Sequence, residues 1–313
     1  MTKCSTGQHP APPAAPPPAA GDRSPGEDTA RARHPPEPHR PAETADPADR
    51  RRGAGHLPDR DGRRRAGPGP APAQSVTTAA AVTAYDDTYY SPAIGKTGTA
   101  LKASLNDIIS KQTKISYSAV WDALKKTDED PNNSSNVILI YTGRSQSKAD
   151  NGGNVGDWNR EHVWAKSHGD FGTTTGPGTD IHHLRPADVQ VNSIRGNKDF
   201  DNGGSAVSGA PGNYTDSDSF EPRDAVKGDV ARMILYMAVR YEGEDGWPDL
   251  EPNNNVNNGT NPYMGRLSVL KQWHQQDPPD AFEKRRNQVI YDTYQHNRNP
   301  FIDHPEWVAS IWG

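Results

Sequence analysis

The chain divides near residue 73 into a segment that cannot build a core and a segment that can. Residues 1–73 contain 16 prolines and no Val, Ile, Phe, Tyr or Trp, and their only large apolar side chains are Met1 and Leu57. Such a segment cannot bury enough apolar surface to offset the entropy lost on ordering it. We therefore predict a disordered Pro/Ala/Arg-rich tail over 1–73 and a folded domain over 74–313.

The tail has two further interpretations besides that of a flexible linker. Its residue types are those that GC-rich codons encode, which suggests translation from a wrong frame or start. Ala71-Pro72-Ala73 resembles the end of a secretory signal peptide, although the apolar stretch that should precede it is missing. We therefore expect a secreted protein whose signal peptide is lost from this chain.

Composition excludes several classes of protein. No stretch approaches the roughly 20 apolar residues of a membrane-spanning helix, and a single cysteine, Cys4, excludes a disulfide scaffold. Residues 74–313 carry 23 basic and 31 acidic side chains, which argues against a protein that holds nucleic acid by bulk charge. An enzyme that binds a metal and places a few Arg and Lys locally remains compatible with this balance.

The spacing of apolar residues predicts an α+β domain that is mostly helical, with two or three short strands near its middle. We expect helices over 99–113, 117–124, 224–241, 263–275, 280–294 and 305–311. Short apolar runs predict strands over 137–142, 161–164 and 181–184. Pro186 is then expected in the first turn of a helix that extends to about residue 194.

The residues that can carry chemistry lie in the centre of the chain. Glu161 and His162 stand on one expected strand, and Asn192 stands on the helix that follows the next strand. If that helix folds back, a carboxylate, an amide oxygen and an imidazole share one small site. Because neighbours in a regular strand face opposite sides, sharing requires the strand to end, twist or bulge at Glu161 and His162.

This set of groups suits the hydrolysis of a phosphodiester. A Mg²⁺-like ion prefers oxygen ligands and keeps several waters, so a carboxylate and an Asn oxygen suffice to anchor it. The ion can neutralise charge that develops on the phosphate, and a neutral His can take a proton from water near pH 7. Zinc would favour three nitrogen or sulfur ligands, and the chain lacks both H-E-x-x-H and cysteine ligands.

Three motifs in order, R-E-H-V-W, D-I-H-H-L-R-P-A and V-N-S-x-R-G-N-K-x-F, resemble those of the endonuclease I family of secreted and periplasmic bacterial nucleases. The resemblance extends from about Tyr89 to Trp312. It implies a ββα-metal (His-Me finger) core, with His162 as general base and Glu161 and Asn192 as metal ligands. It also implies a Mg²⁺-dependent endonuclease without sequence preference, with Mn²⁺ or Ca²⁺ as alternative ions. Such an enzyme cuts DNA and RNA to leave 5′-phosphate and 3′-hydroxyl ends.

The chain departs from the family in its phosphate-binding arginine. Some members place this Arg in the loop after the catalytic His, but here residues 163–179 contain no Arg and one Lys, Lys166. Arg160, Arg185 and Arg195 are the substitutes. We prefer Arg185 as the catalytic arginine because it follows the second strand, and we assign Arg160 and Arg195 to substrate binding.

Two other functions remain open. The same site could serve a phosphodiesterase with a substrate other than nucleic acid, or a secreted binding module could keep the fold without catalysis. The acidic charge favours these alternatives, but a binding module would not need a carboxylate and a general base together. We expect a monomeric enzyme with DNA and RNA as substrates and no attachment to membranes.

Overall fold

The computed structural model describes residues 88–313, so the predicted tail over 1–73 and the predicted boundary at residue 73 lie outside the described residues. The described part mixes helices and strands, in agreement with the expected α+β class. No helix in residues 88–313 is both long enough and apolar enough to cross a membrane.

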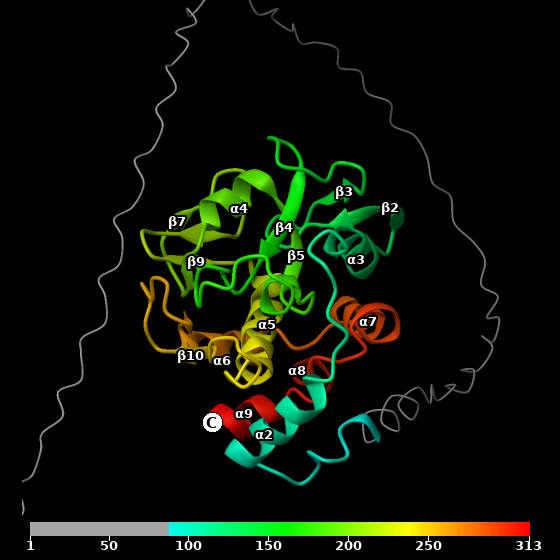
Figure 1. Cartoon of the computed structure of the whole chain (residues 1–313). Coiled ribbons are helices and arrows are strands. Elements are labelled where there is room, and N and C mark those ends of the chain that lie inside the picture. The colour runs from blue at the N-terminus through cyan, green and yellow to red at the C-terminus, as the bar shows by residue number, and fades with distance from the viewer. Residues whose placement is uncertain (1–87) are drawn as a thin grey trace, which may run out of the picture. The chain divides into compact units, whose positions relative to one another are not determined.

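Helix α5 (Lys227–Arg240) forms the centre of the molecule (Figure 1). Every residue from Gly228 to Arg240 is buried, because helices and strands pack around the whole circumference of α5 and not on one face alone. Its neighbours include α2 (Gly98–Ile109), α6 (Leu267–Gln276) and α8 (Pro300–Asp303). The predicted helix over 224–241 is therefore confirmed, except that Asp224–Val226 form a separate 3₁₀ turn, η2.

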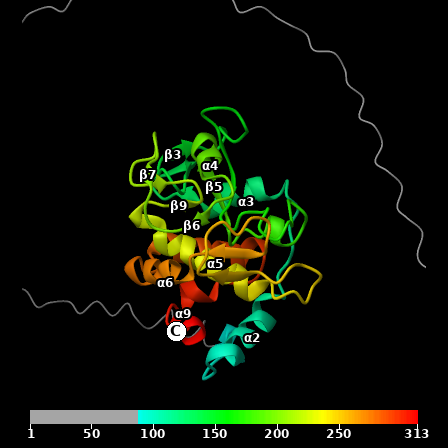
Figure 2. The ribbon, with the colours of Figure 1, turned by 90° about the vertical axis from the view of Figure 1, so that its left-hand side faces the viewer.

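The C-terminal helices pack against three different helices, with α7 (Ala281–Val289) on α3, α8 on α5 and α9 (Trp307–Trp312) on α2. Helix α7 continues into a π-helical turn, η3 (Ile290–Tyr294). Both views place α2 and α9 together at the bottom of the molecule, with α3 and α4 at the top (Figures 1 and 2). The helices predicted over 280–294 and 305–311 are confirmed with shifted ends, whereas of the helix predicted over 263–275 the first residues, Tyr263–Gly265, form a strand and the helix begins at Leu267.

Residues 88–313 contain eleven strands in four small sheets, whereas two or three strands were predicted. One sheet has the order β1-β2-β3, one pairs β4 with β5, one has the order β6-β9-β8-β7, and one pairs β10 with β11. Several of these strands are two or three polar residues long, so no alternating apolar pattern marks them in the sequence. The bounds are β1 (Glu129–Asp130), β2 (Asn133–Ile138), β3 (Ser145–Ser147), β4 (Trp158–His162), β5 (Leu184–Asp188), β6 (Asp199–Phe200), β7 (Ser205–Ala206), β8 (Tyr214–Thr215), β9 (Ser219–Glu221), β10 (Glu251–Asn253) and β11 (Tyr263–Gly265).

The prediction that Pro186 opens a helix is wrong. Pro186 lies inside β5, and helix α4 (Val189–Arg195) begins three residues later, where the Asp188 carboxylate accepts hydrogen bonds from two backbone N–H groups. The Pro186 carbonyl accepts a bond from the Ile140 amide, on the side of β5 away from β4. A backbone N–H at Pro186 would point to that same side, so proline costs the β4–β5 pairing no hydrogen bond.

A second, smaller core supports the β4–β5 pair. It joins α3 (Val120–Thr127) to the two strands through Val120, Leu124, Trp158 and Leu184, apart from the main core around α5. Because α3 and α4 both pack on these strands, the β4–β5 pair is held from two sides. The residues at the end of β4 are thereby fixed in place.

Candidate active site

The segment β4–β5–α4 brings four of the predicted site residues to one cavity: Arg160 and the three that were expected to carry the chemistry. Glu161, His162 and Asn192 all line a cavity of about 470 Å³. Strands β4 and β5 pair in regular antiparallel register, with Glu161 opposite Arg185, and α4 packs against both strands. The predicted meeting of the helix with the strand that carries Glu161 and His162 is therefore present in the structure.

The edge of β4 explains how adjacent residues share this cavity. Strand β4 pairs with β5 in a two-stranded sheet and ends at His162, without a bulge in the pairing. Asn159 and Glu161 contact α4 on one face of the strand, while Arg160 and His162 contact Tyr117 on the other. A cavity at the unpaired edge and end of the strand is lined by side chains from both faces.

Glu161 is a buried carboxylate with two fixed partners. Its Oε1 accepts a hydrogen bond of 2.6 Å from the Tyr141 hydroxyl and one of 2.9 Å from Nη1 of Arg195. Burial raises the pKa of Glu161, and the Arg195 guanidinium and these hydrogen bonds oppose that rise. Because both side-chain bonds fall on Oε1, the Oε2 atom remains for a ligand in the cavity.

Asn192 is oriented by its amide nitrogen. Its Nδ2 donates a hydrogen bond of 2.6 Å to Oδ1 of Asn159, which leaves the Asn192 Oδ1 atom as the free acceptor. A carboxylate oxygen and an amide oxygen that border one cavity are the donor set that Mg²⁺, Mn²⁺ or Ca²⁺ accepts. The residues present therefore fit a hard divalent ion, with water completing its coordination.

His162 has the environment of a neutral base. Its Nε2 lies 3.0 Å from the Gly178 carbonyl, so we assign the proton to Nε2 and a free lone pair to Nδ1. Burial, followed by the neighbouring His183, holds the pKa of His162 well below its usual value of 6.5. The imidazole is therefore uncharged at neutral pH and can accept a proton at Nδ1.

The structure does not bring Arg185 to the cavity. Its guanidinium lies 2.6 Å from an Asp128 oxygen and 3.1 Å from an Asp229 oxygen, and the residue is only 2% exposed. The side chain is enclosed between β5, α3 and α5, where a phosphate cannot reach it. The preferred sequence assignment of Arg185 as the catalytic arginine is corrected on this ground.

Arg195 is also unable to contact a substrate, since it has no exposed surface. Its Nη1 donates to Glu161 and to the His162 carbonyl, and its Nη2 donates to the Val163 carbonyl at 2.7 Å. Arg195 therefore holds the end of β4 from inside the protein, which corrects its assignment to substrate binding. Arg160 and Lys166 do line the cavity and supply its positive charge.

A model of the family described as Endonuclease I matches residues 97–306, which is most of the chain. The chain belongs to the endonuclease I family. An extracellular ribonuclease of Bacillus amyloliquefaciens is 69% identical over 238 residues, covering 75% of this chain and 82% of the relative. An extracellular ribonuclease of Bacillus subtilis (strain 168) is 68% identical over 238 residues, covering 76% and 83%.

A more distant relative extends the comparison to another nuclease type. An extracellular deoxyribonuclease of Aeromonas hydrophila is 29% identical over 133 residues, covering 40% of this chain and 49% of the relative. The family and these relatives support an enzyme that hydrolyses nucleic acids.

Several residues that build this endonuclease I site escaped the sequence analysis. Tyr141 and Asn159 hold Glu161 and Asn192, and Tyr117 stacks on His162 with ring centroids 5.8 Å apart. The pattern around residue 117 predicted only a helix, and nothing in the sequence pairs it with His162. For Asn159, one feature of the sequence could have indicated a role in the site, namely its place in the motif that includes Glu161.

The two histidines of the second motif are buried and lie outside the cavity lining. His182 bonds Asn297 through Nε2, and His183 bonds the Pro177 carbonyl at 2.7 Å. His162 bonds the next carbonyl, that of Gly178, so His162 and His183 hold consecutive residues of one turn. His183 therefore supports the turn that orients His162.

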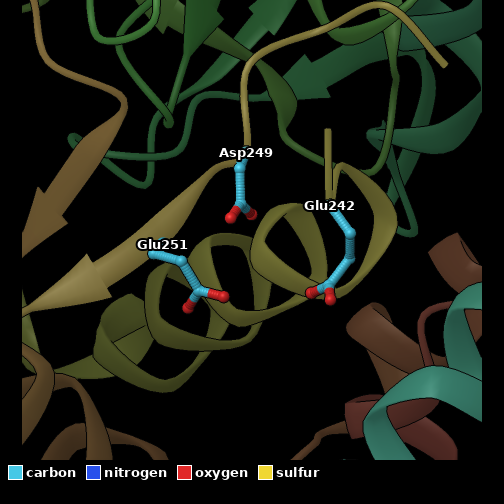
Figure 3. A group of neighbouring side chains, drawn as sticks. All are labelled: Glu242, Asp249 and Glu251. Carbon is cyan, nitrogen blue, oxygen red and sulfur yellow. The ribbon is translucent and has the colours of Figure 1, made fainter. Parts of the chain in front are cut away.

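An acidic group lies apart from this site. Glu242, Asp249 and Glu251 bring three carboxylates within 4.8 Å of one another, between the end of α5 and β10 (Figure 3). Lys102 forms ion pairs with both Glu242 and Glu251, so a cation of the protein itself already compensates part of the negative charge of this group. None of the three residues lines the cavity at β4.

Proposed function

We propose that this chain is a secreted, metal-dependent endonuclease that hydrolyses phosphodiester bonds of DNA and RNA with little sequence preference. The observation that carries the proposal is the presence of Glu161, His162 and Asn192 around one cavity. Their order along strand, strand and helix corresponds to a His-Me finger site. The products of the proposed reaction are 5′-phosphate and 3′-hydroxyl ends.

The relatives support the breadth of the substrate class. The Bacillus relatives are named ribonucleases and the Aeromonas relative a deoxyribonuclease, and all three are named extracellular. Phosphodiester chemistry is common to both substrates, and the cavity is lined mainly by polar side chains. We infer from these points that the enzyme acts outside the cell on DNA and RNA, and we propose that it does so as a monomer.

Glu161 and Asn192 would hold the ion through Oε2 and Oδ1. When bound, an ion of the Mg²⁺ type supplies positive charge that stabilises the phosphate and the leaving oxygen. Mn²⁺ and Ca²⁺ accept the same oxygen donors. Tyr141 and Asn159 orient these two ligands, because they bond Oε1 of Glu161 and Nδ2 of Asn192, the atoms that would not hold the ion.

His162 acts as the general base in this proposal. Its Nδ1 takes a proton from the attacking water, and the Gly178 carbonyl stabilises the charged imidazole that results. The low pKa of His162 keeps the lone pair available at neutral pH. Tyr117 limits the rotation of the ring by stacking on it.

The proposal is tested by plasmid nicking and by cleavage of single-stranded RNA, in Mg²⁺ and in EDTA. We expect both substrates to be cut in Mg²⁺ alone, and His162→Ala to lower the rate roughly 10²- to 10⁴-fold. Calorimetry should show that this variant still binds Mg²⁺. The matched control is His296→Asn, which changes an exposed histidine outside the cavity to a residue that tolerates its positive φ of 58°.

Three results would contradict the proposal. Cutting in EDTA would remove the ion from the reaction, and an active His162→Ala variant would move the general base elsewhere. A folded protein that hydrolyses a small aryl phosphodiester but neither nucleic acid would support the phosphodiesterase alternative.

A further inference from the structure

Arg160 is an unpaired cation at the wall of the active-site cavity. Within residues 88–313 no carboxylate lies within ion-pair distance of it, whereas Arg185 and Arg195 are each ion-paired and buried. Two cationic residues line the cavity, the arginine Arg160 and the lysine Lys166. The positive charge of Arg160 has no carboxylate partner among residues 88–313, so it is available to an anionic ligand in the cavity.

Two aromatic rings hold the Arg160 guanidinium in a fixed position. Its central carbon lies 3.6 Å from the Tyr117 ring centroid and 4.0 Å from the Trp121 ring centroid. Guanidinium is weakly hydrated and stacks favourably on aromatic faces, so this arrangement is stable without a ligand. Because the side chain is ordered beforehand, little conformational entropy is lost when it binds an anion.

The hydrogen bonds of Arg160 leave one edge of the guanidinium free. Nη1 donates to the Tyr117 carbonyl at 2.7 Å, and Nε is buried without a partner. In the described part of the chain Nη2 makes no hydrogen bond, and it is not among the buried unpartnered atoms. Since Arg160 lines the cavity, we infer that this free edge is the part available to a ligand there.

The position of Arg160 on β4 determines which phosphate it can hold. Arg160 and His162 stand two residues apart on the same face, and both contact Tyr117. Two residues of a strand span about 6.6 Å, so Arg160 is offset along the strand from the base that attacks. A guanidinium clamped between two rings also cannot follow the movement of the reacting phosphate.

We propose that Arg160, clamped between Tyr117 and Trp121, is a binding site for the substrate phosphate next to the one that is cleaved. The inference rests on the proposed nuclease function and adds a fixed phosphate subsite to it. Such a contact is equally strong before and during the reaction, so it contributes to KM more than to kcat. It is also independent of base identity, in accord with a nuclease without sequence preference.

The test measures binding apart from cleavage. A short fluorescein-labelled single-stranded DNA is titrated with the full chain in EDTA, at several salt concentrations, and followed by anisotropy. Arg160→Gln should weaken binding roughly tenfold, the usual size for loss of one charged hydrogen bond. The slope of log K against log salt should fall in magnitude by about 0.7, the increment for one phosphate on a single strand.

The control is Arg266→Gln, which removes the same charge outside the cavity. Arg266 is 41% exposed in its side chain and pairs with Asp201 at 3.2 Å. This variant should bind the oligonucleotide as the unchanged chain does. Equal weakening by both substitutions would reduce the effect to net charge and overturn the subsite.

Changes at Tyr117 test the clamp without removing the arginine. Tyr117→Leu frees the guanidinium and should weaken binding several-fold, whereas Tyr117→Phe keeps the ring and should bind more tightly than Tyr117→Leu. In Mg²⁺, Arg160→Gln should raise KM roughly tenfold at a nearly constant kcat.

Two outcomes separate failure of this inference from failure of the proposed function. If the chain cuts nucleic acid but Arg160→Gln and Tyr117→Leu both bind as the unchanged chain does, the subsite is overturned and the nuclease stands. If the folded chain neither binds nor cuts DNA or RNA, the proposed function fails and the subsite fails with it.

Discussion

Arg195 offers the sharpest test of how this site is built, because it bonds one proposed metal ligand and stands on the helix that carries the other. It stands three residues after Asn192 on α4, and it bonds Glu161 on β4. The same guanidinium bonds the carbonyls of His162 and Val163 at 2.7 Å each. Arg195 thus connects the helix that carries one ligand to the strand that carries the other.

The perturbation is Arg195→Lys. A lysine ammonium keeps a positive charge near Glu161 but cannot span the carboxylate and both carbonyls, so about two charged hydrogen bonds are lost. At about 1.5 kcal/mol each, the free energy of unfolding should fall by about 3 kcal/mol. Since the partners that orient a metal ligand typically contribute 10- to 100-fold to affinity, Mg²⁺ binding should weaken by about that factor.

The assay combines calorimetric titration of Mg²⁺ with urea unfolding. The matched control is Arg232→Lys, because Arg232 is equally buried and bonds both oxygens of Glu283, at 2.7 and 2.6 Å, away from the cavity. We expect a comparable loss of stability in the control but unchanged Mg²⁺ affinity. At saturating Mg²⁺, the KM of Arg195→Lys for nucleic acid should equal that of the unchanged chain.

The reasoning would be refuted if Arg195→Lys bound Mg²⁺ normally, or if Arg232→Lys weakened the affinity to the same extent. A raised KM at saturating Mg²⁺ would instead indicate that Arg195 binds the substrate, as the sequence analysis expected.

Two further predictions concern buried charge. Arg185→Gln leaves Asp128 and Asp229 without this partner, so it should lower the free energy of unfolding by about 3 kcal/mol in urea titrations. Its KM for nucleic acid should not change; a raised KM with normal stability would place Arg185 at the substrate. Burial lowers the pKa of His183 from 6.5 to about 4, so the unfolded chain binds the extra proton first as pH falls. The free energy of unfolding therefore falls as the pH drops from 6.5 toward 4, and it is lower by about 2 kcal/mol at pH 4.5. In urea unfolding, His183→Asn should lose less free energy of unfolding between pH 7 and pH 4.5 than the unchanged chain. An equal loss would show that His183 does not cause this pH dependence.

The meeting of Glu161, His162 and Asn192 could be predicted because these residues are close in sequence and lie in linked motifs. Glu161, His162 and Asn192 fall within some 30 residues, and one strand–strand–helix unit brings them together. The long helix α5 could also be predicted, because its apolar residues recur at helical spacing. These features depend on local pattern, which a single sequence displays directly.

The roles of the arginines were decided by tertiary packing. Arg160, Arg185 and Arg195 were all candidates in the sequence, with Arg185 preferred for its place after the second strand, but their surroundings come from distant segments. Tyr117 lies 43 residues before Arg160, and Asp229 lies 44 residues after Arg185. Whether a guanidinium faces a cavity or a buried carboxylate depends on such contacts, and no periodicity along the chain records them.

The sequence by itself therefore determined the family, the three residues that meet at one cavity and the helix at the centre of the core. The tertiary structure decided where α4 begins, how adjacent residues of β4 share one cavity, and which arginine remains free for a phosphate. The physical reason is that covalent neighbours and helical periodicity act within a few residues. Charge compensation and burial are set by whichever segments pack together in the folded chain.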